Sequence, residues 1–158
     1  MVAVPRHARA ARGLRQEAAG SGVVVAGAPI PARDAWRWDD RSGVLNAYYA
    51  AAEVAFVGGS LAPHGGHNPL EPAAYGAALL MGPHHASQGE AVAALKRRDA
   101  LWEVEDEAAL GSALTALLGN PAAREIRARA AIEVAQSQRG AGRRAVRCLC
   151  AWGLWPVA

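Results

Sequence analysis

One stretch of the sequence decides the fold: Phe56-Val57-Gly58-Gly59-Ser60-Leu61-Ala62-Pro63-His64-Gly65-Gly66-His67-Asn68-Pro69-Leu70-Glu71-Pro72. The apolar residues 54–57 predict a short buried strand, and the two glycine pairs after it predict a loop. Asn68 before Pro69 is typical of a helix N-cap and first helical position, and Glu71 is placed for a capping box. A helix N-terminus after a glycine loop, at the carboxyl edge of a parallel sheet, offers backbone N–H groups to an anion. The stretch therefore predicts a phosphate or nucleotide-phosphate site.

The composition is that of a globular domain whose core is built largely from alanine, leucine and valine. The chain has 158 residues, of which 52% are hydrophobic and 20% charged. We predict a single domain over residues 1–158, with a helical tail from about residue 121. The net charge of +3 comes without an aromatic-interleaved basic run, so we expect solvated arginine faces and no nucleic-acid partner. Two cysteines, Cys148 and Cys150, do not indicate a disulfide framework.

Strand patterns alternate with helix patterns along the chain, which is typical of βαβ units. We expect strands at residues 1–4, 23–25, 36–38, 54–57, 77–81 and 101–104. We expect helices at residues 8–19, 44–52, 68–75, 88–97, 106–118, 121–138 and 143–152. The right-handed crossover rule then predicts an α/β, Rossmann-like, mostly parallel sheet with helices on both faces. The first strand begins abruptly, so we expect that material upstream of it is missing.

The glycines and polar residues of the central stretch each have a ligand interpretation and a structural one. Four glycines either let the backbone approach a phosphate or serve a loop that needs positive φ: Gly58, Gly59, Gly65 and Gly66. Their spacing matches neither the GxGxxG nor the Walker A pattern. Asn68 and Glu71 share a helix face, where Glu71 either caps the helix or accepts hydrogen bonds from paired hydroxyls such as those of a ribose.

Basic and imidazole side chains near the strand ends are further candidates. Arg6 and His7 follow a predicted strand directly, where an arginine fork suits a phosphate, although an exposed solvated role is the alternative. Four histidines raise the question of a metal: His64, His67, His84 and His85. They lie on two loops without a nearby cysteine or a helical HxxxH spacing, so we predict no metal ion and place one histidine, His67, near the phosphate.

Other polar and aromatic residues are assigned structural roles. Asp39 and Asp40 could do acid/base work, but the following glycine favours a turn that leads into a helix. Four tryptophans are predicted to pack rather than to stack on a base: Trp36, Trp38, Trp152 and Trp155. No apolar run reaches membrane-spanning length, which predicts a soluble chain and leaves contact with a membrane surface open.

The chain resembles a known family in three motifs of the central region. They are residues 56–60, residues 65–76 (Gly65-Gly66-His67-Asn68-Pro69-Leu70-Glu71-Pro72-Ala73-Ala74-Tyr75-Gly76) and Met81-Gly82-Pro83-His84. The likeness extends upstream to residues 4–7, 40–43 and 49–55. Together these motifs look like the signature of the 3-deoxy-D-manno-octulosonic acid (Kdo) transferases, glycosyltransferases of lipopolysaccharide synthesis. The resemblance covers nearly the whole chain but only the second half of the family's protein.

The resemblance implies the C-terminal, donor-binding domain of a two-domain GT-B fold, with its first βα unit missing before Met1. The family transfers Kdo from CMP-Kdo to lipid A precursor with inversion, without a metal or another cofactor. Carried over residue by residue, the resemblance implies that Arg6 meets the donor phosphate and that the Gly43 turn lies by the cytidine, with His7 counted among the donor-binding residues. It also implies that Asn68 and Glu71 bind phosphate and ribose groups. The loop around CMP would be formed by Gly58, Gly59, Ser60, Gly65 and Gly66, with His67 counted among the donor-binding residues.

The resemblance also limits what this chain is expected to do. The family's general base is a glutamate of the N-terminal domain, so we expect no catalytic residue here and an inactive isolated chain. The lipid A precursor would be bound by the missing half, and the full-length family works at the cytoplasmic face of the inner membrane. Two alternatives stay open: a stand-alone nucleotide-binding or interaction module without catalysis, and a GT-B domain that uses a UDP-sugar.

Overall fold

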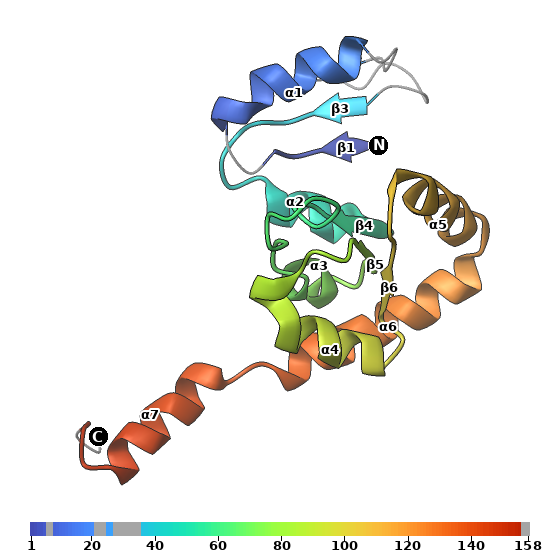
Figure 1. Cartoon of the computed structure of the whole chain (residues 1–158). Coiled ribbons are helices and arrows are strands. Elements are labelled where there is room, and N and C mark those ends of the chain that lie inside the picture. Colours follow the sequence, from blue (N-terminus) through green and yellow to red (C-terminus); the bar gives the residue numbers. More distant parts are fainter. Residues whose placement is uncertain (6–7, 21–24, 27–35, 156–158) are drawn as a thin grey trace. The chain divides into compact units, whose positions relative to one another are not determined.

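The computed structural model describes residues 1–5, 8–20, 25–26 and 36–155 (Figure 1). The chain forms two compact units, Met1–Ala51 and Ala52–Ala158. Each unit combines parallel strands with helices, so the predicted α/β class with mostly parallel pairing is confirmed. The prediction of a single domain over residues 1–158 stays a prediction.

The first unit contains a three-stranded parallel sheet of very short strands. Its elements are β1 (Val2–Ala3), α1 (Ala8–Gly20), β2 (Val25–Ala26), β3 (Trp36–Trp38) and α2 (Leu45–Ala51). The strand order is β1-β3-β2, with Val2 opposite Arg37 and Val25 opposite Trp36. Trp36 and Trp38 are half-buried in the central strand, as their predicted packing role requires.

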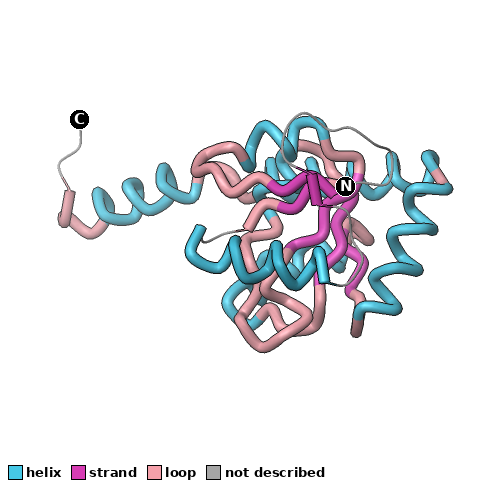
Figure 2. The backbone as a smooth tube through the Cα atoms, turned by 90° about the horizontal axis from the view of Figure 1, so that it is seen from above, coloured by secondary structure: helices cyan, strands magenta, loops and turns pink. Residues whose placement is uncertain are grey.

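The second unit is organised on a three-stranded parallel sheet in the order β4-β5-β6 (Figure 2, strands in magenta). Its strands are β4 (Val54–Val57), β5 (Ala78–Met81) and β6 (Leu101–Glu103), close to the predicted ranges. All four residues of the central strand β5 are fully buried, because it is paired on both sides and covered on both faces. Burying a leucine or methionine side chain completely contributes about 1.5–3 kcal/mol to stability.

Helices cover both faces of this sheet (Figure 1). These helices are α3 (Leu70–Ala74), α4 (Gly89–Arg97), α5 (Glu107–Gly119) and α6 (Pro121–Ser137), with a short 3₁₀ helix η1 (Ala86–Gln88). Helix α7 (Ala141–Ala151) follows α6 in the sequence. On one face Ala113 and Leu117 of α5 join Leu80 and Val104 in one buried cluster. The strand pleat turns Leu79 and Met81 to the opposite face, on which α3, α4 and α6 lie.

Two helix starts follow directly from the local sequence. The Asp106 carboxylate accepts a hydrogen bond from Ala109 N at 2.7 Å and begins α5. The Asn120 side chain accepts one from Ala123 N at 3.1 Å, and Pro121 then takes the first position of α6. In the described part of the chain, no helix combines the length and the apolar character that crossing a bilayer would require.

Candidate functional site

The loop after β4 folds back on itself through its glycines. Gly66 N donates to Gly59 O at 2.8 Å, and His67 N donates to Gly58 O at 3.1 Å. Gly59, Gly65 and Gly66 have φ values of 70°, 85° and 72°, which side-chain-bearing residues rarely adopt. The backbone N–H groups of Gly66 and His67 are already used in hydrogen bonds within the loop. An anion would therefore have to bind to other N–H groups.

The same glycines also allow the second unit's own segments to approach closely. A Cβ on Gly66 would lie 2.5 Å from the Met81 methyl carbon and 3.2 Å from the His84 carbonyl oxygen. A Cβ on Gly65 would collide with the hydroxyl of Ser87. Internal packing therefore requires these glycines, so their presence alone does not demonstrate a ligand.

Ser60 ties the glycine loop to the end of β5. Its side chain is fully buried, and its hydroxyl donates to Val57 O at 2.6 Å while it accepts from Gly82 N at 2.9 Å. His84 N in turn donates to Ser60 O at 2.9 Å. The hydroxyl group of Ser60 is thus fully used in hydrogen bonds within the protein. Ser60 therefore holds the loop in its conformation.

The expected capping box at Asn68 and Glu71 is wrong by one residue. Helix α3 begins at Leu70 with Pro69 in the N-cap position, and Asn68 precedes it. Asn68 Oδ1 accepts from Leu70 N at 3.0 Å, and Asn68 Nδ2 donates to Glu71 Oε1 at 3.3 Å. An asparagine bonds the backbone two residues on as readily as it caps a helix, and the sequence does not distinguish the two.

The side chains around the start of α3 form a small polar surface. The Glu71 carboxylate is exposed and oriented by the Asn68 amide. The His67 ring lies against Gly59, where an added Cβ would be 3.3 Å from the ring atom Cε1. Because α3 is only five residues long, its dipole is small, and most of the attraction for an anion must come from individual N–H groups.

A second loop, residues 82–87, fastens the glycine loop to the rest of the sheet. Ser87 Oγ donates to Gly65 O at 2.5 Å, and His85 Nε2 lies 2.8 Å from Glu103 Oε2 at the end of β6. Lys96 Nζ donates to the same carboxylate oxygen at 3.1 Å. Burial alone would raise the pKa of Glu103, but its bonds from His85 and Lys96 prevail and lower it.

Glu103 was not predicted as a site residue from the sequence, although a signal for it was present. Glu103 lies near the end of the strand predicted at residues 101–104 and is the last residue of β6, and carboxyl ends of parallel strands meet at the ligand edge of the sheet. Of the four histidines, His85 is the one that binds this carboxylate. Among the described residues, no group of three or more histidine, cysteine, aspartate or glutamate side chains is placed to hold a metal ion.

In the first unit, Gly43 lies in the turn before α2 with φ 81°, and a Cβ there would meet nothing within 4 Å. Arg6 and His7 lie outside the described residues. The turn also contains a charged cluster that the sequence analysis did not predict. Asp39, only 5% exposed, accepts from Arg41 Nε at 2.9 Å and from the Tyr48 hydroxyl at 2.6 Å.

This cluster changes the titration of its members. The hydrogen bonds from Arg41 and Tyr48 hold the pKa of the Asp39 carboxyl far below its ordinary value. The hydrogen bond to Asp39 raises the pKa of Tyr48, because the carboxylate accepts a hydrogen bond that only the protonated phenol can donate. The guanidinium of Arg37 lies 5.8 Å from the centroid of the Tyr48 ring. Asp39 therefore stabilises the turn as an ion-pair centre, which agrees with the structural role favoured from the sequence.

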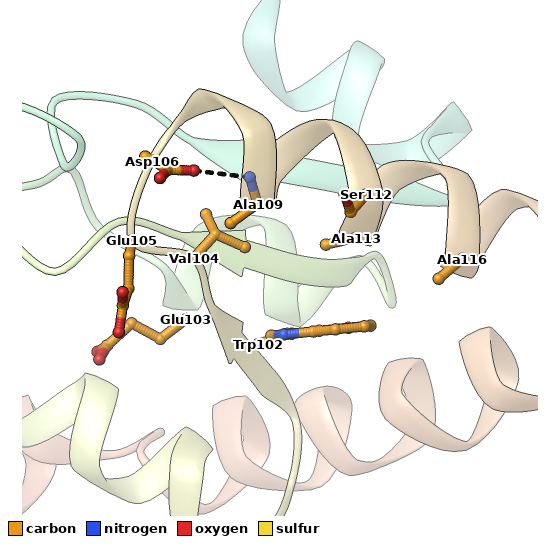
Figure 3. A pocket seen from close by; sticks show the side chains of 9 residues that line it. All are labelled: Trp102, Glu103, Val104, Glu105, Asp106, Ala109, Ser112, Ala113 and Ala116. Carbon is orange, nitrogen blue, oxygen red and sulfur yellow. Dashed lines mark hydrogen bonds between the residues drawn. The ribbon is translucent and has the colours of Figure 1, made fainter.

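A cavity of about 490 Å³ lies on the α5 side of β6 (Figure 3). It is lined by the Trp102 ring, three acidic residues and small residues of α5: Glu103, Val104, Glu105, Asp106, Ala109, Ser112, Ala113 and Ala116. None of the ligand-binding residues expected from the sequence lines it. Its acidic rim would repel a phosphate, so this cavity is not the expected nucleotide site.

Comparisons with curated sequences and with solved structures both find Kdo transferases. The chain is 41% identical over 103 residues to the 3-deoxy-D-manno-octulosonic acid transferase of Haemophilus influenzae, which covers 65% of this chain and 24% of the relative. It is 39% identical over 114 residues to the enzyme of the same name from Bordetella pertussis, covering 72% of this chain and 26% of the relative. The matched region thus spans about a quarter of the length of these curated relatives. No protein-family model matches the chain.

A solved structure gives the same answer for the fold. The crystal structure of the C-terminal CMP-Kdo binding domain of WaaA from Acinetobacter baumannii matches with a TM-score of 0.80 and 26% identity. The match covers 87% of this chain and 73% of that one. The parallel strands, the flanking helices and this match define the Rossmann-like C-terminal half of a GT-B glycosyltransferase. Within that class, the chain belongs with the Kdo transferases, as a homologue of their C-terminal half.

Proposed function

We propose that this chain is the donor-binding half of a Kdo transferase and binds the CMP part of CMP-Kdo. The observation that carries the proposal is the glycine loop at the carboxyl edge of a parallel sheet, in a chain that matches a CMP-Kdo binding domain in fold. In the full protein, Kdo would pass from CMP-Kdo to lipid A precursor at the cytoplasmic face of the inner membrane.

The proposed contacts follow from the chemistry of each group. The loop of Gly58, Gly59, Gly65 and Gly66 lets a phosphate approach the backbone closely. The exposed Glu71 carboxylate suits the paired hydroxyls of a ribose, because it accepts with two oxygens and Asn68 holds it in one orientation. Arg6 and His7 are proposed at the phosphate, Gly43 by the cytidine, and His67 and Ser60 as supports of the loop.

The reaction divides between two halves of the full protein. An inverting transfer needs a base that deprotonates the acceptor hydroxyl and a clamp that stabilises the departing nucleotide. We assign the clamp to this chain. We assign the base to a glutamate outside this chain, so the chain alone should bind CMP without transferring Kdo.

Calorimetry of the chain with CMP tests the proposal. We expect a Kd between about 0.1 and 1 mM, which corresponds to a binding free energy of about −4 to −5.5 kcal/mol. The binding is weak because we assign half of the site to residues outside this chain. UDP should bind more weakly. Stronger binding of UDP would favour a UDP-sugar enzyme, and no binding of either nucleotide would favour an interaction module. Transfer from CMP-Kdo by the chain alone would contradict the assignment of the base.

The variant Glu71→Gln separates a ligand group from a helix-stabilising one. The variant keeps the shape of the side chain and its hydrogen bond to Asn68. It removes the charge and leaves one acceptor oxygen in place of the two that would bind paired hydroxyls. Glu90→Gln, an exposed glutamate in the first turn of α4, is the matched control. Weaker CMP binding by Glu71→Gln alone supports the proposal, whereas unchanged binding with lower stability assigns Glu71 a structural role only.

A further inference from the structure

The loop of residues 82–87 packs directly against the glycine loop. A Cβ on Gly66 would lie 3.2 Å from His85 Cα, so the main chains of these two residues are in contact. Ser87 N donates to Gly65 O at 3.3 Å, and the Ser87 hydroxyl donates to the same carbonyl oxygen. The conformation of residues 82–87 therefore limits the space that Gly65 and Gly66 can occupy.

The side chain of His85 connects this loop to the sheet. Its Nε2 lies 2.8 Å from Glu103 Oε2, and Glu103 is the last residue of β6 (Figure 3). The main chain of His85 is held as well, because its N–H donates to Pro83 O at 3.2 Å and its carbonyl accepts from Gln88 N at 2.8 Å. The bond to Glu103 thus orients a residue whose main chain touches Gly66.

Glu103 is held in turn by a second element of the fold. Lys96 Nζ of α4 donates to Glu103 Oε2 at 3.1 Å, the same oxygen that His85 contacts. The side chains of His85 and Glu103 are only 22% and 29% exposed, so their hydrogen bond is partly shielded from water. A partly buried carboxylate with two donors has a well-defined position, because both donors restrict its rotation. Glu103 therefore gives the 82–87 loop a fixed point of attachment.

The charge of Glu103 argues against a direct contact with the phosphate. A carboxylate repels a phosphate group, so Glu103 can serve an anion site only through the main chain that it orients. That main chain lies against Gly66, whose N–H closes the glycine loop by donating to Gly59 O at 2.8 Å. Loss of the bond between His85 and Glu103 would free the 82–87 loop and, with it, the closed conformation of the glycine loop.

We propose that Glu103 is a positioning residue for the nucleotide site and that, through His85, it keeps the glycine loop ready to receive the phosphate of CMP. This inference rests on the proposed function and adds to it a residue that does not touch the nucleotide. An ordered loop loses less conformational entropy when a ligand binds, so its order favours binding. When the ordered conformation is less populated, the apparent Kd rises in proportion.

Hydrogen exchange of backbone amides in the free chain tests the positioning role without a ligand. Glu103→Met removes the acceptor and keeps a long side chain. We expect the Gly66 and His67 amides to exchange about five times faster in this variant, the order of effect of one partly exposed hydrogen bond to a charged group. The amides of β5 report global unfolding and are measured separately. Unchanged exchange of Gly66 and His67 overturns the proposal, whether or not β5 exchanges faster.

Variants of His85 test whether the effect passes through this hydrogen bond. His85→Gln keeps an amide donor for Glu103 and should leave the exchange of Gly66 within about twofold of wild type. His85→Leu removes the donor and should accelerate the exchange as Glu103→Met does. The double variant should exchange no faster than about twofold above either single variant, because both changes remove the same bond. Additive effects, or equal losses in His85→Gln and His85→Leu, contradict the proposal.

Titration with CMP, followed by amide chemical shifts, connects the loop to binding. Glu103→Met should weaken CMP binding about threefold to tenfold, in parallel with the loss of protection at Gly66. Glu133→Met, which breaks the exposed ion pair with Arg98, is the matched control and should change the Kd less than about twofold. Wild-type affinity in Glu103→Met overturns the proposal. If the wild-type chain binds no CMP, the proposed function fails by itself, and the exchange of Gly66 and His67 still decides the positioning role.

Discussion

Gly82 and Ser60 hold the ends of two neighbouring strands together at close range. The Gly82 N–H donates to Ser60 Oγ at 2.9 Å, and a Cβ on Gly82 would lie 2.3 Å from the Ser60 carbonyl oxygen. No side chain larger than hydrogen fits between these two segments. The position of the glycine loop is therefore determined by the strand beside it as well as by its own sequence.

The substitution Gly82→Ala should lower the free energy of unfolding by about 1–3 kcal/mol, because the new methyl group meets backbone atoms that cannot rotate away. Denaturant unfolding followed by circular dichroism measures the change. Gly111→Ala in α5 is the control, since a Cβ there meets nothing within 4 Å, and it should raise stability by about 0.5–1 kcal/mol. Equal effects of both substitutions would contradict the close contact.

Replacing Ser60 with alanine should cost about 1–3 kcal/mol of stability, because Gly82 N–H stays buried without its acceptor. Ser112→Ala removes a hydroxyl that bonds to Ala108 O on the exposed side of α5, and its effect should stay within about 0.5 kcal/mol. The same denaturation experiment compares the two. If Ser60→Ala were neutral, the hydroxyl would not be the link between the strand ends.

Glu103→Gln tests the network that fastens the 82–87 loop. The pKa of Glu103 is lowered from 4.5 in the folded chain, so the carboxylate stabilises the fold above that value and loses this effect as the pH falls. The stability difference between wild type and variant should be full above about pH 5 and should shrink as the pH falls below 4.5. Urea unfolding at several pH values measures it.

The control for this experiment is Glu133→Gln. Glu133 pairs with Arg98 at 2.8 Å, but both side chains are about 60% exposed, so the change should stay below about 1 kcal/mol. A stability difference for Glu103→Gln that does not depend on pH would show that packing, and not charge, is lost there.

The Asp39 cluster should dominate the acid sensitivity of the first unit. Asp39→Asn removes the charge that binds Arg41 and Tyr48, so it should destabilise the turn at neutral pH. Because the pKa of Asp39 is depressed in the folded state, this loss is full above about pH 4 and disappears only in strong acid. Hydrogen exchange of the backbone amides of residues 36–51 measures this loss of local stability. The control is the substitution Asp40→Asn at the exposed neighbouring residue.

The hydrogen bond between Tyr48 and the Asp39 carboxylate should also be detectable at alkaline pH. The pKa of Tyr48 is raised, so its phenol should ionise at higher pH than a tyrosine in the unfolded chain. Ultraviolet titration should show one late-ionising tyrosine that returns to an ordinary value in Asp39→Asn. An unchanged titration curve in the variant would contradict the hydrogen bond between the two side chains.

Strong local signals made much of this fold predictable. Strands β4, β5 and β6 are short apolar runs between glycine and proline residues, and helices α5 and α6 begin close to the predicted residues 106 and 121. The position of Asn68 was harder to predict. An asparagine before a proline caps a helix or closes a turn at similar energy, and contacts of the loop decide between them.

What failed depended on contacts between residues far apart in the chain. The hydrogen bond between His85 and Glu103 joins positions eighteen residues apart, and neither residue's neighbours point to the other. The exposure of Trp152 and Trp155 was mispredicted for the opposite reason. A tryptophan is usually buried, and only the absence of packed neighbours around the described part of the C-terminal segment shows that these are not.

The sequence by itself determined the α/β class, the order of strands and helices, and the glycine loop before α3, because hydrophobic period, glycine and capping residues act over a few neighbouring positions. Only the tertiary structure showed that the loop's glycines serve close packing against Met81 and Ser87, and that Ser60 joins the ends of β4 and β5. The reason is physical: a hydrogen bond or a steric limit between distant segments exists only once the sheet has brought them together.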